Sequence, residues 1–152
     1  MRNGKLVCYL AGAVDDPGWR KDVIRSCRGA EYLSPMDDVG AVYSNAFQMT
    51  QASMEHPTFH LMDKIKIEQA DVVFAYFQSG SDSVFSGTSF ECGVAVALGK
   101  PVIVVNDMEN AYLYEMVQRF ASVYCPTLDN GIYFLRSMIR EASHRAGRGK
   151  CR

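Results

Sequence analysis

The sequence has 152 residues, of which 48% are hydrophobic and 22% are charged, and its formal net charge is −1. This length and composition predict one soluble globular domain with a core of its own. A charge so close to zero argues against a protein that binds nucleic acid or a membrane surface. No apolar run approaches the roughly 18 residues that a membrane span requires.

The sequence shows no pattern typical of a signal peptide or of disulfide bonds. The N-terminal stretch MRNGKLVCYLAG contains no cleavage pattern of a signal peptide. The five cysteines form no CxxC or other close pair, and such an odd, scattered set predicts reduced thiols in a cytoplasmic protein. They are Cys8, Cys27, Cys92, Cys125 and Cys151.

The first third of the chain predicts a strand, a helix and a second strand. The apolar run 6–10 (LVCYL) is typical of a buried strand. Pro17 suits the first turn of a helix, which the apolar spacing extends to Arg28. A short strand is expected at 30–33. Residues 36–54 then lack a clean period, and so long a stretch inside a compact domain is more often a functional loop or lid than filler.

From residue 57 onward, helical and strand-like apolar patterns alternate. This alternation predicts βαβ crossovers and a parallel sheet covered by helices on both faces, and runs such as VVFAYF and VIVV suit strands buried on both sides. We therefore expect an α/β, flavodoxin-like three-layer sandwich with five parallel strands in the order 2-1-3-4-5. The expected elements are helices at 57–68, 88–98, 111–120 and 128–142 and strands at 71–77, 101–105 and 122–125.

This single domain would span residues 1–143 and be followed by a flexible basic tail, 144–152. In a sheet of this order the switch point lies between the first and third strands. Ligands would therefore meet the loops that follow Leu10 and Phe77.

One carboxylate, Glu91, stands where the loop after the third strand enters a helix. Two interpretations fit its spacing. In the first, Thr88 and Glu91 form a capping box, in which each side chain bonds the other's backbone N–H. In the second, N–H groups at the helix start hold Glu91 ionised at neutral pH, and the carboxylate attacks an anomeric carbon. The spacing alone favours the capping box and leaves both open.

Five short segments in a fixed order carry a resemblance to a known family. They are Tyr9 to Gly12, Asp63, Ala70 to Val73, Gly87 to Gly93 and Gly99 to Ile103. Together they resemble the nucleoside 2-deoxyribosyltransferase family, whose relatives include the deoxynucleoside monophosphate N-glycosidases. The likeness runs from about Lys5 to Val105. Each motif is short, but their order and spacing together are fairly specific.

The resemblance implies that Glu91 is the nucleophile that takes up the deoxyribosyl group at C1′. It also implies that Asp63 positions or protonates the leaving base, and that Tyr9, at the end of the first strand, orients the Glu91 carboxylate through its phenol. Residues near 110 fall where the family often lends side chains to the neighbouring subunit. The substrate-binding residues implied are Ala11, Gly12, Trp19, Arg20, Asp82, Ser86, Gly87, Asn110 and Tyr112.

Taken by themselves, several of these residues have structural explanations. Tyr9 in a buried strand is more often part of the core, and Asp63 on a helix is more often solvated. Asp71 is more often a turn residue, and Asn110 could cap the next helix. Phe85 departs from the family, because transferases usually carry Asp at this position and nucleotide-hydrolysing relatives commonly carry Ser. The choice of base, and of nucleoside or nucleotide, therefore stays open.

The expected function is cleavage of the N-glycosidic bond of a (deoxy)nucleoside or its 5′-monophosphate through a covalent glycosyl-Glu91 intermediate, with transfer of the sugar to another base or to water. The alternatives are an NAD-type glycohydrolase and a nucleotide-sensing module without turnover. We expect no metal or organic cofactor, although the four-residue spacing of His56 and His60 can hold a metal. A homodimer or larger homo-oligomer is expected, with no nucleic-acid or membrane partner.

Overall fold

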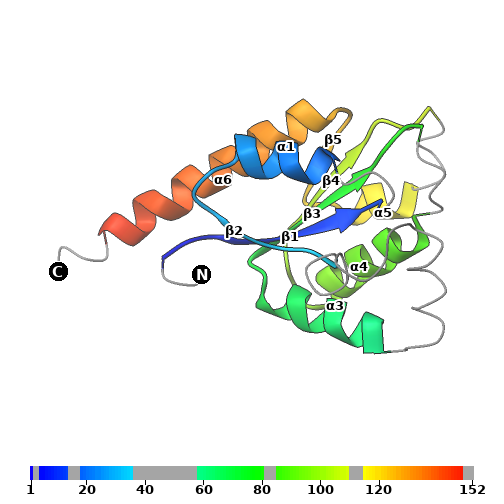
Figure 1. The fold of residues 1–152 in the computed structure, drawn as a ribbon, viewed down its shortest axis with the longest axis horizontal. Coiled ribbons are helices and arrows are strands. Elements are labelled where there is room, and N and C mark those ends of the chain that lie inside the picture. The colour runs from blue at the N-terminus through cyan, green and yellow to red at the C-terminus, as the bar shows by residue number, and fades with distance from the viewer. Residues whose placement is uncertain (2–3, 14–17, 36–57, 81–84, 110–114, 149–152) are drawn as a thin grey trace.

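The computed structural model describes residue 1 and residues 4–13, 18–35, 58–80, 85–109 and 115–148. Within these ranges five parallel strands form one sheet in the order β2-β1-β3-β4-β5, with helices on both faces (Figure 1). This confirms the expected fold class and strand order. The strands are β1 (Val7–Gly12), β2 (Glu31–Leu33), β3 (Val72–Phe77), β4 (Val102–Asn106) and β5 (Val123–Cys125).

The helices divide between the two faces of the sheet. One face carries α1 (Gly18–Ser26) and α6 (Leu128–Arg148), and the other carries α3 (Thr58–Gln69), α4 (Ser86–Ala97) and α5 (Glu115–Phe120) (Figure 1). The strands β1, β3 and β4 are buried along their full length, so that alternate side chains enter two separate apolar clusters, as the continuous apolar runs predicted.

The structure shifts several element boundaries. Strand β1 runs on to Gly12, so Tyr9 lies in the middle of the strand and not at its end. Tyr9 packs in the cluster that includes Ile67 and Cys92, so its side chain lies on the face of the sheet that α3 and α4 cover. The predicted helix start at Pro17 and the 36–54 segment lie outside the described residues.

The expected end of the last helix, at residue 142, is wrong. Helix α6 continues to Arg148, so residues 144–148, which were assigned to the tail, are helical. The added turns have local support, since Arg145 pairs with Glu141 one turn earlier at 2.9 Å and the Ser143 hydroxyl bonds the Ile139 carbonyl at 2.9 Å.

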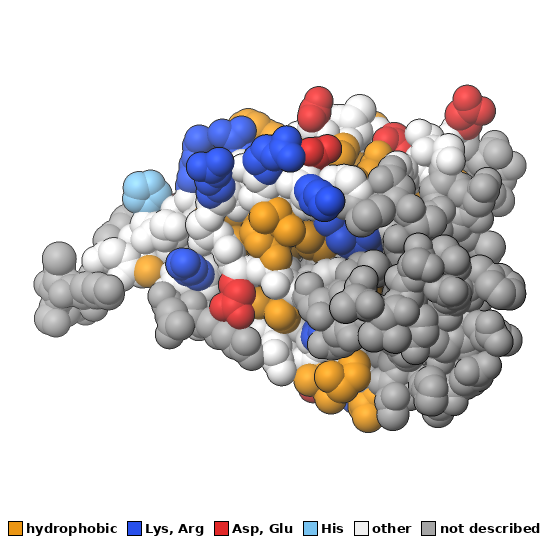
Figure 2. Space-filling model, in the orientation of Figure 1, with side chains coloured by type: hydrophobic (Ala, Val, Ile, Leu, Met, Phe, Trp, Pro, Cys, Tyr) orange, Lys and Arg blue, Asp and Glu red, His pale blue; other side chains and the backbone are white. Residues whose placement is uncertain are grey.

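Helix α6 lies against the sheet with almost no space between them at Gly131. A Cβ atom at this position would fall 2.3 Å from Val105 Cγ2 and 2.9 Å from Phe74 Cζ. The absence of a side chain here lets the helix backbone approach β3 and β4 directly. On the outer side of this layer, Lys and Arg side chains gather over α1 and α6 (Figure 2). Lys21 of α1 and Arg140 of α6 are exposed.

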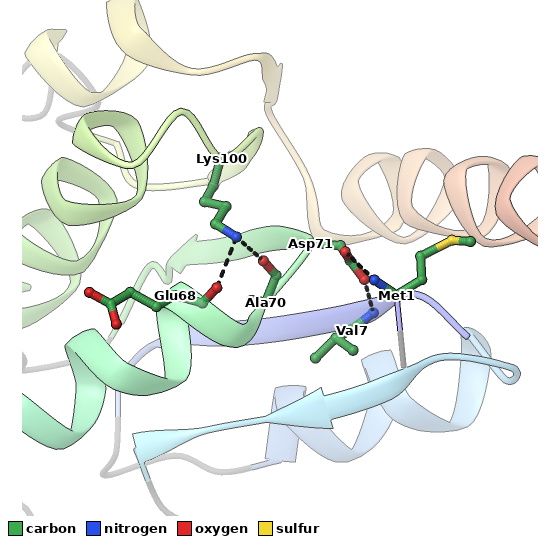
Figure 3. A network of polar contacts seen from close by, with 6 residues as sticks. All are labelled: Met1, Val7, Glu68, Ala70, Asp71 and Lys100. Carbon is green, nitrogen blue, oxygen red and sulfur yellow. Dashed lines mark hydrogen bonds and ion pairs between the residues drawn. The ribbon is translucent and has the colours of Figure 1, made fainter. Parts of the chain in front are cut away.

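The amino ends of the central strands are tied together by polar contacts (Figure 3). The Asp71 carboxylate accepts hydrogen bonds from the Val7 N–H at 2.9 Å and from the Met1 amino group at 2.8 Å. Burial alone would raise the pKa of Asp71, but these two donors outweigh it and lower the pKa. The Lys100 ammonium group bonds the carbonyls of Glu68 and Ala70 at 2.9 and 2.8 Å. Asp71 thus has the structural role that its position predicted.

Candidate active site

Three side chains that the sequence singled out meet between the sheet and the helices α3 and α4. Tyr9 comes from the middle of β1, Asp63 from α3 and Glu91 from the second turn of α4. The Tyr9 hydroxyl donates to Glu91 Oε1 at 2.5 Å and lies 3.1 Å from Asp63 Oδ1. Tyr9 and Glu91 are buried and Asp63 is half-buried. Asp63 is therefore the member of the trio that faces outward.

The number of protons shared by these three side chains depends on the Tyr9 hydroxyl. A tyrosine hydroxyl has one hydrogen and cannot donate to two carboxylates at once. When both Asp63 and Glu91 are ionised, one of them faces the Tyr9 oxygen without a hydrogen between them. An additional proton on either carboxyl relieves this repulsion, because that carboxyl then donates to the Tyr9 oxygen. The arrangement thus favours one neutral and one ionised carboxyl, linked through Tyr9.

The electrostatic environment of Glu91 also favours a neutral carboxyl. Burial raises the pKa of Glu91 to about 8; the Asp63 charge adds to this rise, whereas the Tyr9 hydrogen bond and the charges of Arg20 and Lys66 oppose it. Burial, together with the two neighbouring carboxyls, holds the pKa of Tyr9 far above its usual value. Tyr9 therefore stays a neutral phenol and acts only as a hydrogen-bond partner. A carboxyl with a pKa near 8 is poised to change its protonation state close to neutral pH.

The capping-box interpretation of Glu91 is wrong. Helix α4 begins at Ser86, and the residue before it, Phe85, is the N-cap and has no side-chain capping bond. The first helical hydrogen bond joins the Ser89 N–H to the Phe85 carbonyl at 2.9 Å. Glu91 therefore lies beyond the free N–H groups of the first turn, and its carboxylate bonds Tyr9. The expectation that helix N–H groups hold it ionised is also wrong, since its pKa is raised.

Phe85 belongs to the core. Its backbone has φ 48° and ψ 18°, in the left-handed region that a bulky side chain rarely adopts. Its side chain is buried, and its ring centroid lies 5.5 Å from that of Phe77, at the end of β3. Phe85, where the resemblance led us to expect Asp or Ser, thus fills this position with an apolar contact. Nothing in the sequence signals this left-handed turn, because the packing that stabilises it comes from tertiary structure.

Trp19 and Arg20 secure the backbone where β1 ends. The Arg20 guanidinium donates to the carbonyls of Gly12 and Ala13 at 2.8 and 2.6 Å and lies 4.5 Å from the centre of the Trp19 ring. A Cβ atom at Gly12 would fall 2.6 Å from Trp19 Cζ2. The predicted pocket residues Gly12, Trp19 and Arg20 are therefore brought together, whereas Ala11 packs in the cluster on the other face of the sheet from Trp19. Arg20 is close enough to act on the charge of Glu91.

The remaining predicted residues are only partly described. Gly87 lies in the first turn of α4, exposed, and a Cβ atom there would meet nothing within 4 Å. Ser86 begins the same helix, while Asp82, Asn110 and Tyr112 lie outside the described residues. Lys66, which the sequence patterns did not single out, is buried, and its charge acts on Glu91. Its position three residues after Asp63 on the same helix was the available signal.

Neither metal nor membrane features were found in the parts of the chain that the structure describes. No group of three or more His, Cys, Asp or Glu residues there could hold a metal ion, and His56 lies outside these parts. None of the described helices is both long enough and apolar enough to cross a membrane.

The family model described as "Nucleoside 2-deoxyribosyltransferase" matches residues 8–143, which is most of the chain and includes all three members of the trio. The chain belongs to the nucleoside 2-deoxyribosyltransferase family. This confirms the resemblance inferred from the short motifs, and with it the prediction that the protein is an enzyme of the nucleoside 2-deoxyribosyltransferase kind.

Solved structures related to this family share the fold. A 2-deoxyribosyltransferase from the psychrotolerant bacterium Bacillus psychrosaccharolyticus is 20% identical with a TM-score of 0.60, and the match covers 82% of this chain and 88% of that chain. A CMP N-glycosidase from Clostridium botulinum is 21% identical with a TM-score of 0.51, covering 85% and 97% of the two chains. A comparison with curated protein sequences gave no match.

Proposed function

We propose that this enzyme cleaves the N-glycosidic bond of a 2′-deoxynucleoside or its 5′-monophosphate by nucleophilic catalysis at Glu91. The observation that carries the proposal is the Tyr9 hydroxyl held 2.5 Å from Glu91 and 3.1 Å from Asp63. Family membership supplies the reaction class, and the trio supplies a nucleophile, a proton donor and a group that links them. The proton count described above gives the two carboxyls complementary states.

The reactive state has an ionised Glu91 and a protonated Asp63. The Glu91 carboxylate attacks C1′ and forms a C–O bond while the C1′–N bond breaks through an oxocarbenium-like transition state. The bonding electron pair leaves with the base, which takes its proton from Asp63. Tyr9 remains neutral throughout and keeps the attacking carboxylate in place by its hydrogen bond.

The second step returns the enzyme to its starting state. Asp63, now ionised, accepts a proton from an incoming base or from water. That base or water attacks C1′ as the C–O bond to Glu91 breaks. Two displacements at one carbon give net retention of configuration. Transfer and hydrolysis differ only in the acceptor. Asp63 suits this exchange because it is half-buried, whereas Glu91 is buried.

Base release from a panel of deoxynucleosides and deoxynucleoside 5′-monophosphates, with and without a second base, tests this function. The wild-type enzyme should release free base from at least one of them, and Glu91→Gln should lose at least about 1,000-fold in kcat. NAD belongs in the panel as a control for a glycohydrolase of that type. Turnover by Glu91→Gln at the wild-type rate would contradict the proposal.

We also propose that the enzyme works as a homodimer or larger homo-oligomer. Support comes from large apolar side chains exposed on the layer formed by α3, α4 and α5. They are Leu61, Met62, Phe90, Met116 and Phe120. Light scattering coupled to gel filtration should give at least twice the 16.9 kDa chain mass; an active, monodisperse monomer would count against an assembly.

A further inference from the structure

Lys66 is buried next to the trio but takes no part in the steps above. Lys66 is only 8% exposed. Its ammonium group donates a 2.7 Å hydrogen bond to the carbonyl of Ser34, which is itself buried. Placing an ammonium group in the interior is costly unless nearby charge and hydrogen bonds compensate it. A lysine kept at such a site therefore calls for a physical explanation.

The position of the ammonium group follows from two elements. Ser34 comes directly after β2, whose last residue, Leu33, pairs with Tyr9 of β1. On α3, Lys66 follows Asp63 by three residues, so the two side chains share one face of the helix. The Lys66–Ser34 bond thus joins α3 to the end of β2 and fixes the part of α3 that carries Asp63.

The charges around Glu91 come from several elements. Tyr9 faces it from β1, Arg20 acts from α1, and both Asp63 and Lys66 act from α3. Burial and the Asp63 charge raise the pKa of Glu91, while the charges of Arg20 and Lys66 lower it. Arg20 is bonded to the backbone carbonyls of Gly12 and Ala13, so the two cations approach the carboxyl pair from different elements.

We propose that Lys66 is a positioning residue, whose ammonium group, held by the Ser34 carbonyl, orients Asp63 and stabilises the ionised form of Glu91. This inference rests on the proposed function, because it assigns Lys66 to the same reaction. The residue touches neither base nor sugar in this account. It acts through the two carboxyls, by keeping the reactive combination of an ionised Glu91 and a protonated Asp63 populated.

Lys100 offers a matched control. It is another lysine whose ammonium group bonds backbone carbonyls belonging to α3 and the residue after it, those of Glu68 and Ala70. These contacts lie at the amino end of the sheet, close to Asp71 (Figure 3). Lys100→Gln should therefore share any general loss of stability caused by removing a lysine that bonds backbone carbonyls, without changing the ionisation of Glu91.

The test is a 13C NMR titration of the glutamate carboxyls in the wild type and in Lys66→Gln, Lys66→Met, Lys66→Arg and Lys100→Gln. The Glu91 signal is assigned by its absence from Glu91→Gln. Removing a cation should raise the Glu91 midpoint by about one pH unit in the two neutral Lys66 variants. Lys66→Arg should stay closer to the wild type, and Lys100→Gln should not shift.

Turnover separates this inference from the function itself. If the function holds, the neutral Lys66 variants should show the same upward shift in the alkaline limb of kcat/KM, with kcat affected more than KM. Absence of base release by the wild type would defeat the proposed function, while the titration would still report on Glu91. An unchanged Glu91 midpoint in the neutral variants, or failure of both to fold while Lys66→Arg folds, would overturn the role of Lys66.

Discussion

At the scale of single residues, the protonation of the two carboxyls depends on the single hydrogen of the Tyr9 hydroxyl. The Tyr9 hydroxyl lies within bonding distance of two carboxyls and can satisfy only one of them as a donor. The two carboxyls are therefore linked through one hydroxyl, and a negative charge on one of them opposes ionisation of the other. Because Glu91 is the buried member, its ionisation is opposed by the loss of contact with water.

This predicts how stability depends on pH. The carboxyl has an ordinary pKa of 4.5 and a folded pKa of about 8, so folding favours its neutral form. That stabilisation is fully present below pH 4.5 and is lost as the pH rises toward 8. Glu91→Gln cannot ionise and keeps an acceptor for Tyr9. Relative to the wild type, its free energy of unfolding should increase between pH 5 and pH 9, by at most about 5 kcal/mol.

Denaturant unfolding of both proteins at the two pH values measures this difference. Asp63 is unchanged in the variant, so a parallel pH dependence in the two proteins would show that Glu91 does not titrate in this range. The same midpoint should appear in the activity of the wild type, where kcat/KM should fall as the pH rises past about 8, because the carboxyl pair then loses the one proton that the reactive state needs.

At the scale of elements, helix starts and close contacts decide where the reactive groups lie. The left-handed Phe85 sets the first residue of α4, and the two turns that follow carry Glu91 over Tyr9. On the other face of the sheet, Gly131 lets α6 approach Phe74 and Val105. Tyr9 and Phe74 belong to adjacent strands whose side chains alternate between these faces, so the packing of α6 supports the strands from which the trio is built.

Gly131→Ala should be destabilising by about 1–3 kcal/mol, although alanine is the better helix former. The added methyl group would meet Val105 Cγ2 and the Phe74 ring at distances that atoms do not tolerate. Gly147→Ala, in the same helix and with nothing near its Cβ position, is the control and should be neutral or slightly stabilising. Thermal unfolding compares the two; equal melting temperatures for both variants would show that α6 can move away from the sheet freely.

At the scale of the whole molecule, the trio and the amino-terminal contacts serve different purposes. The trio lies between the sheet and α3 and α4, whereas Asp71 and Lys100 tie the strands and α3 together where β3 begins. Several features of this plan are predictable from sequence. Continuous apolar runs alternating with helical patterns indicate the parallel sheet and its order, and short motifs indicate the family and the identities of Tyr9, Asp63 and Glu91.

Other features depend on contacts that are distant in sequence. The segment from Thr88 to Glu91 matches a capping box, yet α4 starts earlier because Phe85 packs against Phe77. The charge state of Glu91 depends on burial beneath α3, and the place of Lys66 depends on the end of β2, 32 residues away in the chain. Local sequence patterns contain no information on these distances. They therefore predicted that Glu91 is an ionised helix cap, whereas in the structure it is a buried carboxyl with a raised pKa.

Asp71→Asn tests the division between the two regions. The pKa of Asp71 is lowered in the folded protein, so its carboxylate contributes stability above the ordinary value of 3.8 and loses it as the pH falls. The variant should melt a few degrees below the wild type at pH 7, with a smaller difference near pH 3. Its midpoint in the kcat/KM pH profile should match the wild type; a shifted midpoint would mean that the two regions are coupled.

The most direct test of the account is the covalent intermediate. A 2′-fluoro-arabinosyl nucleoside or nucleotide slows the second displacement, so the sugar should accumulate on the nucleophile. Mass spectrometry of the digested protein should then find the adduct on Glu91 in the wild type and no adduct in Glu91→Gln. Base release accompanied by an adduct on another residue, with Glu91 unmodified, would contradict the central claim.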